Sequence, residues 1–458
     1  MSQPTEMTCD VLIVGAGVAG LAAAMELTAN GLKVCLIEAR DRIGGRIYTF
    51  REELDSIPLE LGAEFVHGKA PETFSIADAL GLPLVDVTAS HWSVVDGRLI
   101  RSEESWSELD SIMKRLKEEK GPDRLFTDFL EEYVNETGRT EVKSVASSYV
   151  QGFHAARLDK VGVAGLNRTS EAAESIDGDK SFRILGGYDE LPAAMFSSLK
   201  RELTILNLET VVEEVCWEDG KVEVVTVRRD HRSRLRAPRA ILTLPLGVLK
   251  APPGTKGAVQ ISPRLPERES ALNEVEMGNA VHIALRFTER FWESMEFPTR
   301  EGSASLWDLG FLHARNEVVP TWWTQLPVRT STLVGWAGGG AADELCRLTD
   351  AELVGTAITS LSRILNLDQA RLNRLLDKAF VHNWSTDPFS RGAYSYVGLN
   401  GLDAMKQLAT PVKSTLFFAG EATSFDGHWG TVHGAIGSGR RAAREILGAI
   451  RGKSETVL

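Results

Sequence analysis

CDVLIVGAGVAGLAAAMELTANGLKVCLIEARDRIGGR, residues 9–46, is the stretch that decides the fold. The run VLIV at 11–14 predicts a buried strand, LAAAMELTAN at 21–30 a helix, and KVCLIE at 33–38 a second strand. Gly31 stands where the helix would stop. Strand, helix and strand in this order make one βαβ unit, so the sequence predicts an α/β protein.

The turn between the first strand and the helix reads GAGVAG, which has the spacing of a dinucleotide-binding loop in a Rossmann-like domain. Gly15 permits the turn, Gly17 lets the backbone approach a pyrophosphate, and Gly20 lets the helix pack on the sheet. Free N–H groups at the start of the helix would hold the phosphates. Glu38 ends the second strand, where a carboxylate can accept the ribose hydroxyls of an adenine nucleotide. Because this acid would repel a 2′-phosphate, NADP is disfavoured.

Length and composition restrict the class of protein. A chain of 458 residues allows roughly two or three domains, and 43% hydrophobic with 25% charged residues is the composition of an ordinary globular protein. The net charge of −12 argues against nucleic acid or an anionic membrane surface as the main partner, because both would be repelled. It mildly favours cationic ligands.

Targeting and redox signals favour a cytoplasmic protein. The four cysteines are far apart with no C-x-x-C pair, so we expect reduced thiols and no metal site. The N-terminal MSQPTEMTCD lacks the basic region of a signal peptide. The uncharged run 11–25 is too short for a membrane span, and the tail RGKSETVL offers no anchor.

The continuation EARDRIGGR resembles the second fingerprint of a large flavoprotein superfamily that includes amine oxidases. In that superfamily the residues matching Arg40 and Arg46 lie near the phosphates and sugar, and Gly44 and Gly45 let the backbone run beside the cofactor. Two arginines flanking a glycine pair also suit an extended, anionic cofactor. FAD is therefore favoured over NAD.

The C-terminal stretch LFFAGEATSFDGHWGTVHGAIGSGRRAAREIL, 416–447, predicts a buried strand, a loop and a helix from about Val432. The N-terminus of that helix would present free N–H groups and a positive dipole to the negative charge of a reduced flavin. The alternative is an ordinary strand-loop-helix that closes the domain.

With both ends in view, the chain resembles the flavin-containing amine oxidases, most closely the polyamine oxidase and lysine-specific histone demethylase branch. The motifs LELGAEFVHG, GGYDELP, ILTLPLGVLK, NWSTDPFSRGAYSYVG and GEATS follow one another between the two ends. The resemblance implies that Glu421 binds the ribityl chain, Val211 or Val212 meets the adenine, and the Val432 N–H meets flavin O2. The implied FAD contacts are Gly15, Gly17, Ala19, Gly20, Glu38, Ala39, Arg40, Gly44, Gly45, Arg46, Gly62, Ala63, Glu64, Val212, Trp384, Gly420, Glu421, Thr431 and Val432.

The same resemblance implies the residues on the substrate side. Tyr394 forms one wall of an aromatic cage, Trp384 lies close to the isoalloxazine, and Thr431 occupies the opposite wall, where monoamine oxidases often have Tyr. His67 of EFVHG matches a histidine near the substrate amine, which it would position or deprotonate. Without the family, His67 is better explained as a loop residue that caps backbone groups.

His282 departs from the family pattern. It stands in the strand-like run 280–287, at the place of a lysine that usually holds a water against flavin N5 and is linked to the reaction with oxygen. A lone histidine on such a strand is otherwise a structural residue. We expect His282 to orient a water near N5.

The resemblance implies an FAD-dependent amine oxidase that passes a hydride from the amine to the flavin. An imine results, then an aldehyde or ketone, and oxygen becomes hydrogen peroxide. The replacement at His282 motivates an alternative, an amine dehydrogenase with another electron acceptor. A further alternative is a flavin-binding protein without turnover. The motifs fit several amines and say nothing of the oligomeric state.

We expect two domains. The FAD-binding domain is discontinuous and comprises 5–76, 184–270 and 388–452. A mixed sheet covered by helices, from 77–183 and 271–387, would form the substrate domain. The basic run RRDHRSRLR, 228–236, is interpreted as a solvated hairpin tip, not a polyanion site.

Overall fold

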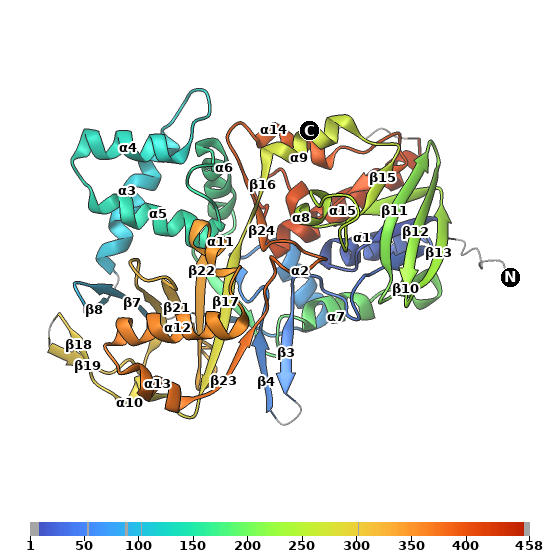
Figure 1. Cartoon of the computed structure of the whole chain (residues 1–458). Coiled ribbons are helices and arrows are strands. Elements are labelled where there is room, and N and C mark those ends of the chain that lie inside the picture. The colour runs from blue at the N-terminus through green and yellow to red at the C-terminus, as the bar shows by residue number, and fades with distance from the viewer. Residues whose placement is uncertain (1–8, 53–54, 88–89, 102, 301, 453–458) are drawn as a thin grey trace.

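The computed structural model describes residues 9–52, 55–87, 90–101, 103–300 and 302–452 (Figure 1). The segments 1–8 and 453–458, which include most of the stretches where we expect no leader and no anchor, lie outside the described residues. Among the described residues, no helix has the length and apolar character that a membrane crossing needs.

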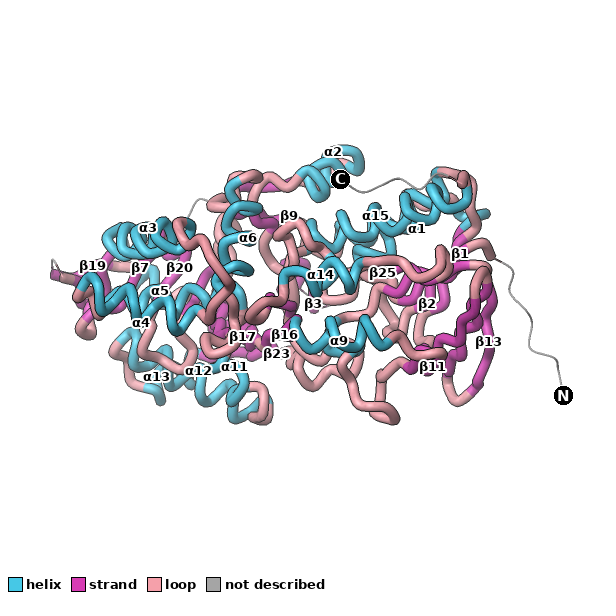
Figure 2. The backbone as a smooth tube through the Cα atoms, turned by 90° about the horizontal axis from the view of Figure 1, so that it is seen from above, coloured by secondary structure: helices cyan, strands magenta, loops and turns pink. Residues whose placement is uncertain are grey.

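The cofactor-side sheet is parallel and built around the βαβ unit predicted from the sequence. Its strands, in spatial order, are β10 (Thr204–Asn207), β2 (Val34–Ile37), β1 (Val11–Val14), β14 (Arg239–Leu242) and β25 (Leu416–Phe418). Two helices, α1 (Val18–Ala29) and α15 (Val432–Ile450), pack side by side on it (Figures 1 and 2). Strands from distant parts of the chain therefore end at the same edge of this sheet. The loops that precede α1 and α15 also lie at that edge.

Both faces of this sheet are covered, which explains why its strands read as continuous apolar runs. Ile13 and Leu36 belong to the core that includes α1, whereas Leu12 and Ile37 face a second sheet. That second sheet has the order β13 (His231–Ala237), β12 (Lys221–Arg228), β11 (Val211–Glu218) and β15 (Gln260–Ser262). The basic run 228–236 supplies the tip between β12 and β13 but also most of β13, so it is longer than the hairpin tip expected.

The substrate-side sheet has nine strands, mixed in direction. Their order is β19 (Gly302–Ala304), β18 (Phe297–Thr299), β8 (Arg98–Arg101), β7 (Ser90–Val95), β20 (Leu309–His313), β21 (Thr321–Thr324), β22 (Thr332–Gly338), β17 (Ala280–Phe287) and β23 (Leu376–Val381). Val281 and Ile283 of β17 pack in one cluster with α11 (Gly340–Leu345), α12 (Asp350–Leu365) and α13 (Gln369–Leu375). Because side chains alternate along a strand, His282 points to the opposite face.

Helices close the other side of that region. α3 (Glu103–Lys117), α4 (Phe126–Thr137), α5 (Glu141–His154) and α6 (Val163–Glu174) share a core of their own, and α5 also packs against β22. In α4 the buried residues Phe126, Phe129, Leu130 and Tyr133 recur three or four positions apart, and Gly138 in the αL conformation ends the helix. In Figure 1 these helices stand at the left, away from α1 and α15.

Two small sheets tie the halves together. β5 (Val66–His67) and β6 (Leu84–Asp86) pair with β9 (Ser181–Ile184), and β16 (Val275–Gly278) pairs with β24 (Tyr394–Val397). The remaining elements are β3 (Thr49–Glu52), β4 (Asp55–Glu60), α2 (Pro71–Leu80), α7 (Glu190–Ser197), η1 (Arg201–Leu203), α8 (Leu246–Leu249), α9 (Pro266–Glu274), α10 (Phe291–Ser294), α14 (Leu402–Ala409) and η2 (Glu421–Thr423). The short pairings bring Glu64, His67 and Tyr394 to one cavity.

Candidate active site

A single cavity of about 1520 Å³ runs from the loop after β1 to the inner face of the nine-stranded sheet. With one exception, Gly20, every residue expected from the sequence to contact FAD or the substrate lines this cavity. Chain segments up to four hundred residues apart therefore contribute to one site, as the fingerprints at both ends implied.

The glycine loop shapes the phosphate end. Gly15 has a φ of +106°, which side chains rarely adopt, and a Cβ on it would lie 2.4 Å from Thr243 Oγ1. A Cβ on Gly20 would lie 2.1 Å from the carbonyl oxygen of Gly15, so this residue sits between helix and strand and does not face the cavity. Gly17 pairs with Gly44 in an isolated bridge. Gly15 and Gly17 before α1, and Gly44 and Gly45 after β2, thus leave backbone without side chains beside the start of α1. We call this surface the cradle, and it fits a pyrophosphate.

Glu38 lies beside the cradle and is buried. Its Oε2 accepts a hydrogen bond from the Ala16 N–H at 2.9 Å, and its Oε1 accepts one from the Arg40 N–H at 2.9 Å. Each carboxylate oxygen has more than one lone pair, so both can also accept from ribose hydroxyls. The arrangement fits the adenosine end of FAD.

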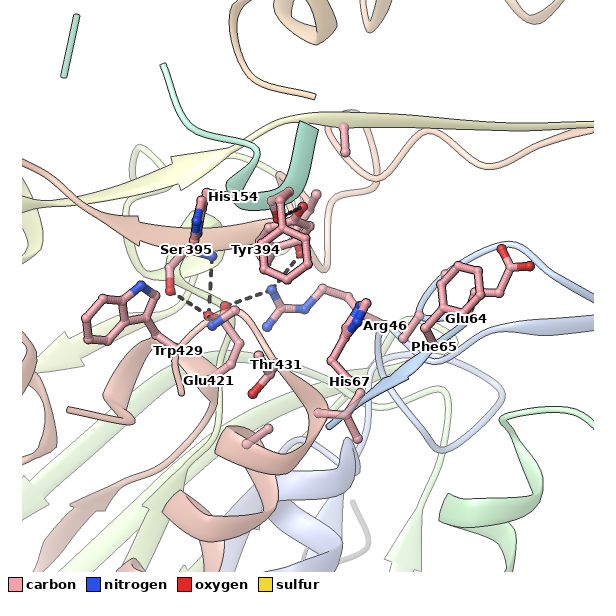
Figure 3. Close-up of a pocket in the computed structure, with 18 of the residues that line it drawn as sticks. Arg46, Glu64, Phe65, His67, His154, Tyr394, Ser395, Glu421, Trp429 and Thr431 are labelled. Atoms are coloured by element: carbon pink, nitrogen blue, oxygen red, sulfur yellow. Dashed lines mark hydrogen bonds and ion pairs between the residues drawn. The ribbon is translucent and has the colours of Figure 1, made fainter. Parts of the chain in front are cut away.

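A partly buried ion pair joins the loop after β2 to the C-terminal motif. Arg46 Nη1 donates to Glu421 Oε1 at 2.8 Å and to the Ala393 carbonyl at 2.8 Å. The other carboxylate oxygen, Oε2, accepts from the Ser395 hydroxyl and from the Gly430 N–H (Figure 3). The Glu421 side chain, implied to bind the ribityl chain, is thus also the junction of four segments of the site.

The N-terminus of α15 opens into the cavity next to this junction. Thr431 is the N-cap: its hydroxyl accepts from the Gly434 N–H at 3.0 Å and donates to the His428 carbonyl. The first helical residue, Val432, also lines the cavity, where helix N–H groups and the helix dipole favour negative charge. This fits the flavin end of the cofactor.

Two aromatic residues of the expected cage lie between the junction and the substrate-side sheet. Tyr394, on β24, donates its hydroxyl to the Phe153 carbonyl at 2.9 Å, and burial raises the pKa of its phenol. Trp384 donates Nε1–H to the Leu61 carbonyl at 2.9 Å. A Cβ on Gly62 would lie 2.1 Å from the Arg46 carbonyl oxygen and 3.1 Å from the Trp384 ring, so the backbone here has no room for a side chain.

His67 lies on β5 with its ring in the cavity. Its neighbours are the rings of Phe65 and Phe153, at 6.0 and 5.4 Å between centroids, and the Ser181 hydroxyl, 3.4 Å from Nδ1. Burial lowers the pKa of His67 to about 4, so the ring is neutral near neutral pH. His67 lies on strand β5, whereas the alternative from the sequence was a loop residue that caps backbone groups.

His282 is 3% exposed and lies in a buried polar cluster, which we define as Glu64, Arg183, His282 and Trp323. The His282 Nε2 lies 3.0 Å from Glu64 Oε2, while Glu64 Oε1 accepts from Arg183 Nη1 at 2.5 Å and Trp323 Nε1 at 2.9 Å. Burial alone would raise the pKa of Glu64, but Arg183 and His282 lower it to about 2. Glu64, expected as a cofactor contact, thus directs its carboxylate to the protein.

Sequence reasoning missed Arg183, a single arginine in the strand SFRI with no motif around it. Three tryptophans of the substrate-side region, Trp307, Trp322 and Trp323, differ in their surroundings. Trp323 lines the cavity, Trp322 is fully buried in the core, and Trp307 is 58% exposed. Trp322 and Trp323 differ because adjacent side chains along β21 point to opposite faces of the sheet.

Known proteins resemble this chain over nearly its whole length. A family profile described as "Flavin containing amine oxidoreductase" matches residues 18–447. Polyamine oxidase 3 of Oryza sativa subsp. japonica is 30% identical, over 96% of this chain and 89% of that protein. Lysine-specific histone demethylase 2 of Homo sapiens is 27% identical, over 95% of this chain and 53% of that protein.

Solved structures share the fold. Wild-type putrescine oxidase bound to putrescine superposes with a TM-score of 0.77 at 24% identity, covering 96% of this chain and 99% of that one. Cyclohexylamine oxidase from Brevibacterium oxydans IH-35A gives 0.76 at 22% identity, covering 97% and 100%.

The two-domain α/β fold and the cofactor predicted from the sequence are confirmed, and the family is one of enzymes, which removes the alternative of a flavin-binding protein without turnover. From the glycine cradle through Glu38 to the start of α15, the residues present fit FAD. The chain therefore belongs to the flavin-containing amine oxidoreductases, with FAD as its cofactor.

Proposed function

We propose that the protein oxidises a small amine at the carbon next to nitrogen, giving an imine that water converts to an aldehyde or ketone, with oxygen reduced to hydrogen peroxide. The continuous cavity, which joins the cofactor cradle to a chamber of aromatic rings, is the observation that carries this proposal. FAD, when bound, supplies the two-electron acceptor.

The protein's own residues hold and orient. The cradle residues, with Arg40, Arg46 and the start of α15, would bind the cofactor. Tyr394 and Trp384, each held by a hydrogen bond to a backbone carbonyl, would form a rigid aromatic wall for the amine. The neutral ring of His67 would position the substrate, since its low pKa makes it a weak base.

The test is reduction of the bound flavin under anaerobic conditions by a panel of monoamines, diamines, polyamines and amino acids. We expect the flavin absorbance to bleach with at least one amine, and to return on mixing with air as hydrogen peroxide appears. If no amine bleaches the flavin, the proposed reaction is wrong.

A second candidate function is amine dehydrogenation with an acceptor other than oxygen. This candidate is favoured by His282, which stands where the family pattern has lysine and whose Nε2 is held by Glu64. Bleaching by an amine, very slow recovery in air and fast recovery with an artificial dye would support this candidate. His282→Lys should then speed recovery in air; an unchanged rate would contradict a role of His282 in the reaction with oxygen.

A further inference from the structure

The buried polar cluster contains one nitrogen without a partner. Within the described residues, His282 Nδ1 has no hydrogen bond, although the ring is almost fully buried and lines the cavity. Buried polar atoms are nearly always satisfied by protein, water or a ligand. The unsatisfied Nδ1 therefore points to a ligand or water in the cavity.

The hydrogen bonds of Glu64 decide which ring nitrogen carries the proton. Arg183 and Trp323 both donate to this carboxylate, and Arg183 also stacks over the Phe65 ring at 4.4 Å. An ionised carboxylate only accepts, so His282 Nε2 must be the donor across the 3.0 Å contact. In the neutral ring, Nδ1 then carries a lone pair and can accept a proton.

The ring lies close to the residues of the proposed substrate wall. His282 lies 6.2 Å from the Trp336 ring, and Trp336 packs in the same cluster as Ala393 and Tyr394. A small amine reaches the cavity mainly as an ammonium ion, which has N–H donors but no lone pair. It must lose one proton before its carbon can give up a hydride.

We propose that His282 Nδ1 takes this proton from the bound ammonium, directly or through one ordered water, and that Glu64 is the positioning residue that holds Nε2. One N–H bond of the ammonium breaks, its electron pair stays on the amine nitrogen, and a new N–H bond forms at Nδ1. The resulting imidazolium lies beside the Glu64 carboxylate. The inference rests on the proposed amine oxidation and assigns the base within it.

The groups around the ring leave few other candidates. Glu64 and, beyond it, Arg183 are the charged residues of the cluster; β21 and β22 present Trp323 and Trp336, and β23 presents the apolar Val381 beside Ile283. His67 and Tyr394 are titratable and line the same cavity. His67 has no carboxylate among its contacts with the described residues, and its pKa of about 4 makes it a poorer proton acceptor.

The first experiment measures anaerobic flavin reduction by stopped flow across pH, using the fastest amine of the panel. In the wild type the rate should fall on the acid side, where the base is already protonated. His282→Gln should lower the rate by about 100-fold and replace this acid limb with one set by the ionisation of the amine itself. Glu64→Gln should keep the limb of the wild type and lower the rate less, because the ring nitrogen remains but loses the carboxylate that holds Nε2.

His67→Gln, at the histidine proposed to position the substrate, should weaken amine binding but retain the acid limb of the wild type. If His282→Gln keeps that limb while the flavin is still reduced, the inference is overturned and the proposed function stands. If no amine reduces the wild-type flavin, the proposed function itself fails.

A second readout needs no turnover and no variant. In the holoenzyme labelled with ¹⁵N-histidine, NMR should show His282 protonated at Nε2 alone. Saturation with tert-butylamine, which has no hydrogen on the carbon next to nitrogen, should shift the Nδ1 resonance, because the bound ammonium or an ordered water then donates a hydrogen bond to this nitrogen. A ring that is doubly protonated before the amine is added, or an Nδ1 resonance that does not move afterwards, would overturn the assignment.

Discussion

Two buried glutamates line the cavity, and each is paired with an arginine. Glu421 binds Arg46 and also accepts from the N–H and hydroxyl of Ser395 on β24 and from the Gly430 N–H in the loop before α15. Glu64 binds Arg183 and then two ring N–H groups, those of Trp323 and His282. One ion pair therefore joins a strand and a loop beside the start of α15, whereas the other ends on an imidazole of the substrate-side sheet.

This difference indicates a different role for each carboxylate. Glu421 joins chain segments, so its hydrogen bonds serve the shape of the flavin end. Glu64 passes its charge to a ring with a second, unsatisfied nitrogen, so it can influence chemistry in the cavity. Burial also differs, since the side chain of Arg46 is 23% exposed whereas that of Arg183 is 9% exposed.

The largest effect is expected from Glu64→Ala. Removing this carboxylate leaves two ring donors without an acceptor and a buried guanidinium whose remaining acceptor is the Thr324 carbonyl, which should cost about 4 kcal/mol of unfolding free energy. Glu421→Ala should cost less, about 2 kcal/mol, because water can reach Arg46. Urea unfolding of the two holoenzymes measures both.

An exposed pair provides the control for this comparison. Glu218→Ala removes the surface contact with Lys221 and should leave the unfolding free energy nearly unchanged, because solvent screens this exposed pair. A larger loss for Glu421→Ala than for Glu64→Ala would show that water does not relieve Arg46, and the contrast between the halves would be wrong.

Gly20→Ala tests the cofactor half through packing. The new methyl would overlap the Gly15 carbonyl, so α1 must move from β1, at a cost of about 3 kcal/mol with weaker FAD binding. Gly31→Ala is the control: Gly31 has a positive φ, which Gly20 does not, but no atom lies within 4 Å of its Cβ position. We expect about 1 kcal/mol and unchanged FAD affinity for the control. Equal FAD affinities would contradict this account.

Glu60, four residues before Glu64, has its pKa shifted in the opposite direction. Burial raises the pKa of Glu60 to about 8 from 4.5. Over that range the unfolded chain releases a proton that the folded chain keeps, so this group makes the unfolding free energy fall as pH rises. Glu64, whose pKa is lowered from 4.5 to about 2, contributes stability that is complete above the upper value and lost as pH falls through the lower one.

Glu60→Gln therefore should be more stable than the wild type above the pKa of Glu60, by about 2 kcal/mol, because the amide carries no charge to bury. The advantage should disappear in acid, where Glu60 is protonated in both states. Thermal unfolding at several pH values measures it, and an advantage that is equal at every pH would rule out titration of Glu60 as the cause.

Thr431→Ala should have the smallest effect. It removes the hydroxyl that caps the Gly434 N–H at the start of α15, which costs about 1 kcal/mol. Thr431→Ser keeps the hydroxyl and should restore most of that stability. If both variants lose the same amount in thermal unfolding, the cap contributes nothing and packing of the Thr431 methyl is responsible.

Most of the cofactor half was predictable from sequence because its signals are local. One continuous stretch near the N-terminus contains the glycine loop and Glu38, and another near the C-terminus contains β25 and α15. A turn or the start of a helix depends on neighbouring residues, so each stretch can be recognised by itself. Position 282 was likewise predicted to lie on a strand. The domain boundaries, 5–76, 184–270 and 388–452 against 77–183 and 271–387, stay a prediction.

The substrate half needed the tertiary structure. Nothing near His282 in the chain says that its ring meets a carboxylate 218 residues away, or that this carboxylate binds an arginine 119 residues from it. Strand periodicity gives two faces but does not say which face meets a cavity.

Sequence alone thus determined an FAD-binding α/β fold, since short-range geometry encodes it. Only the packing of β17 against β22, and of Glu64 beneath both, decided that His282 belongs to a polar cluster in the cavity, because long-range contacts leave no local pattern.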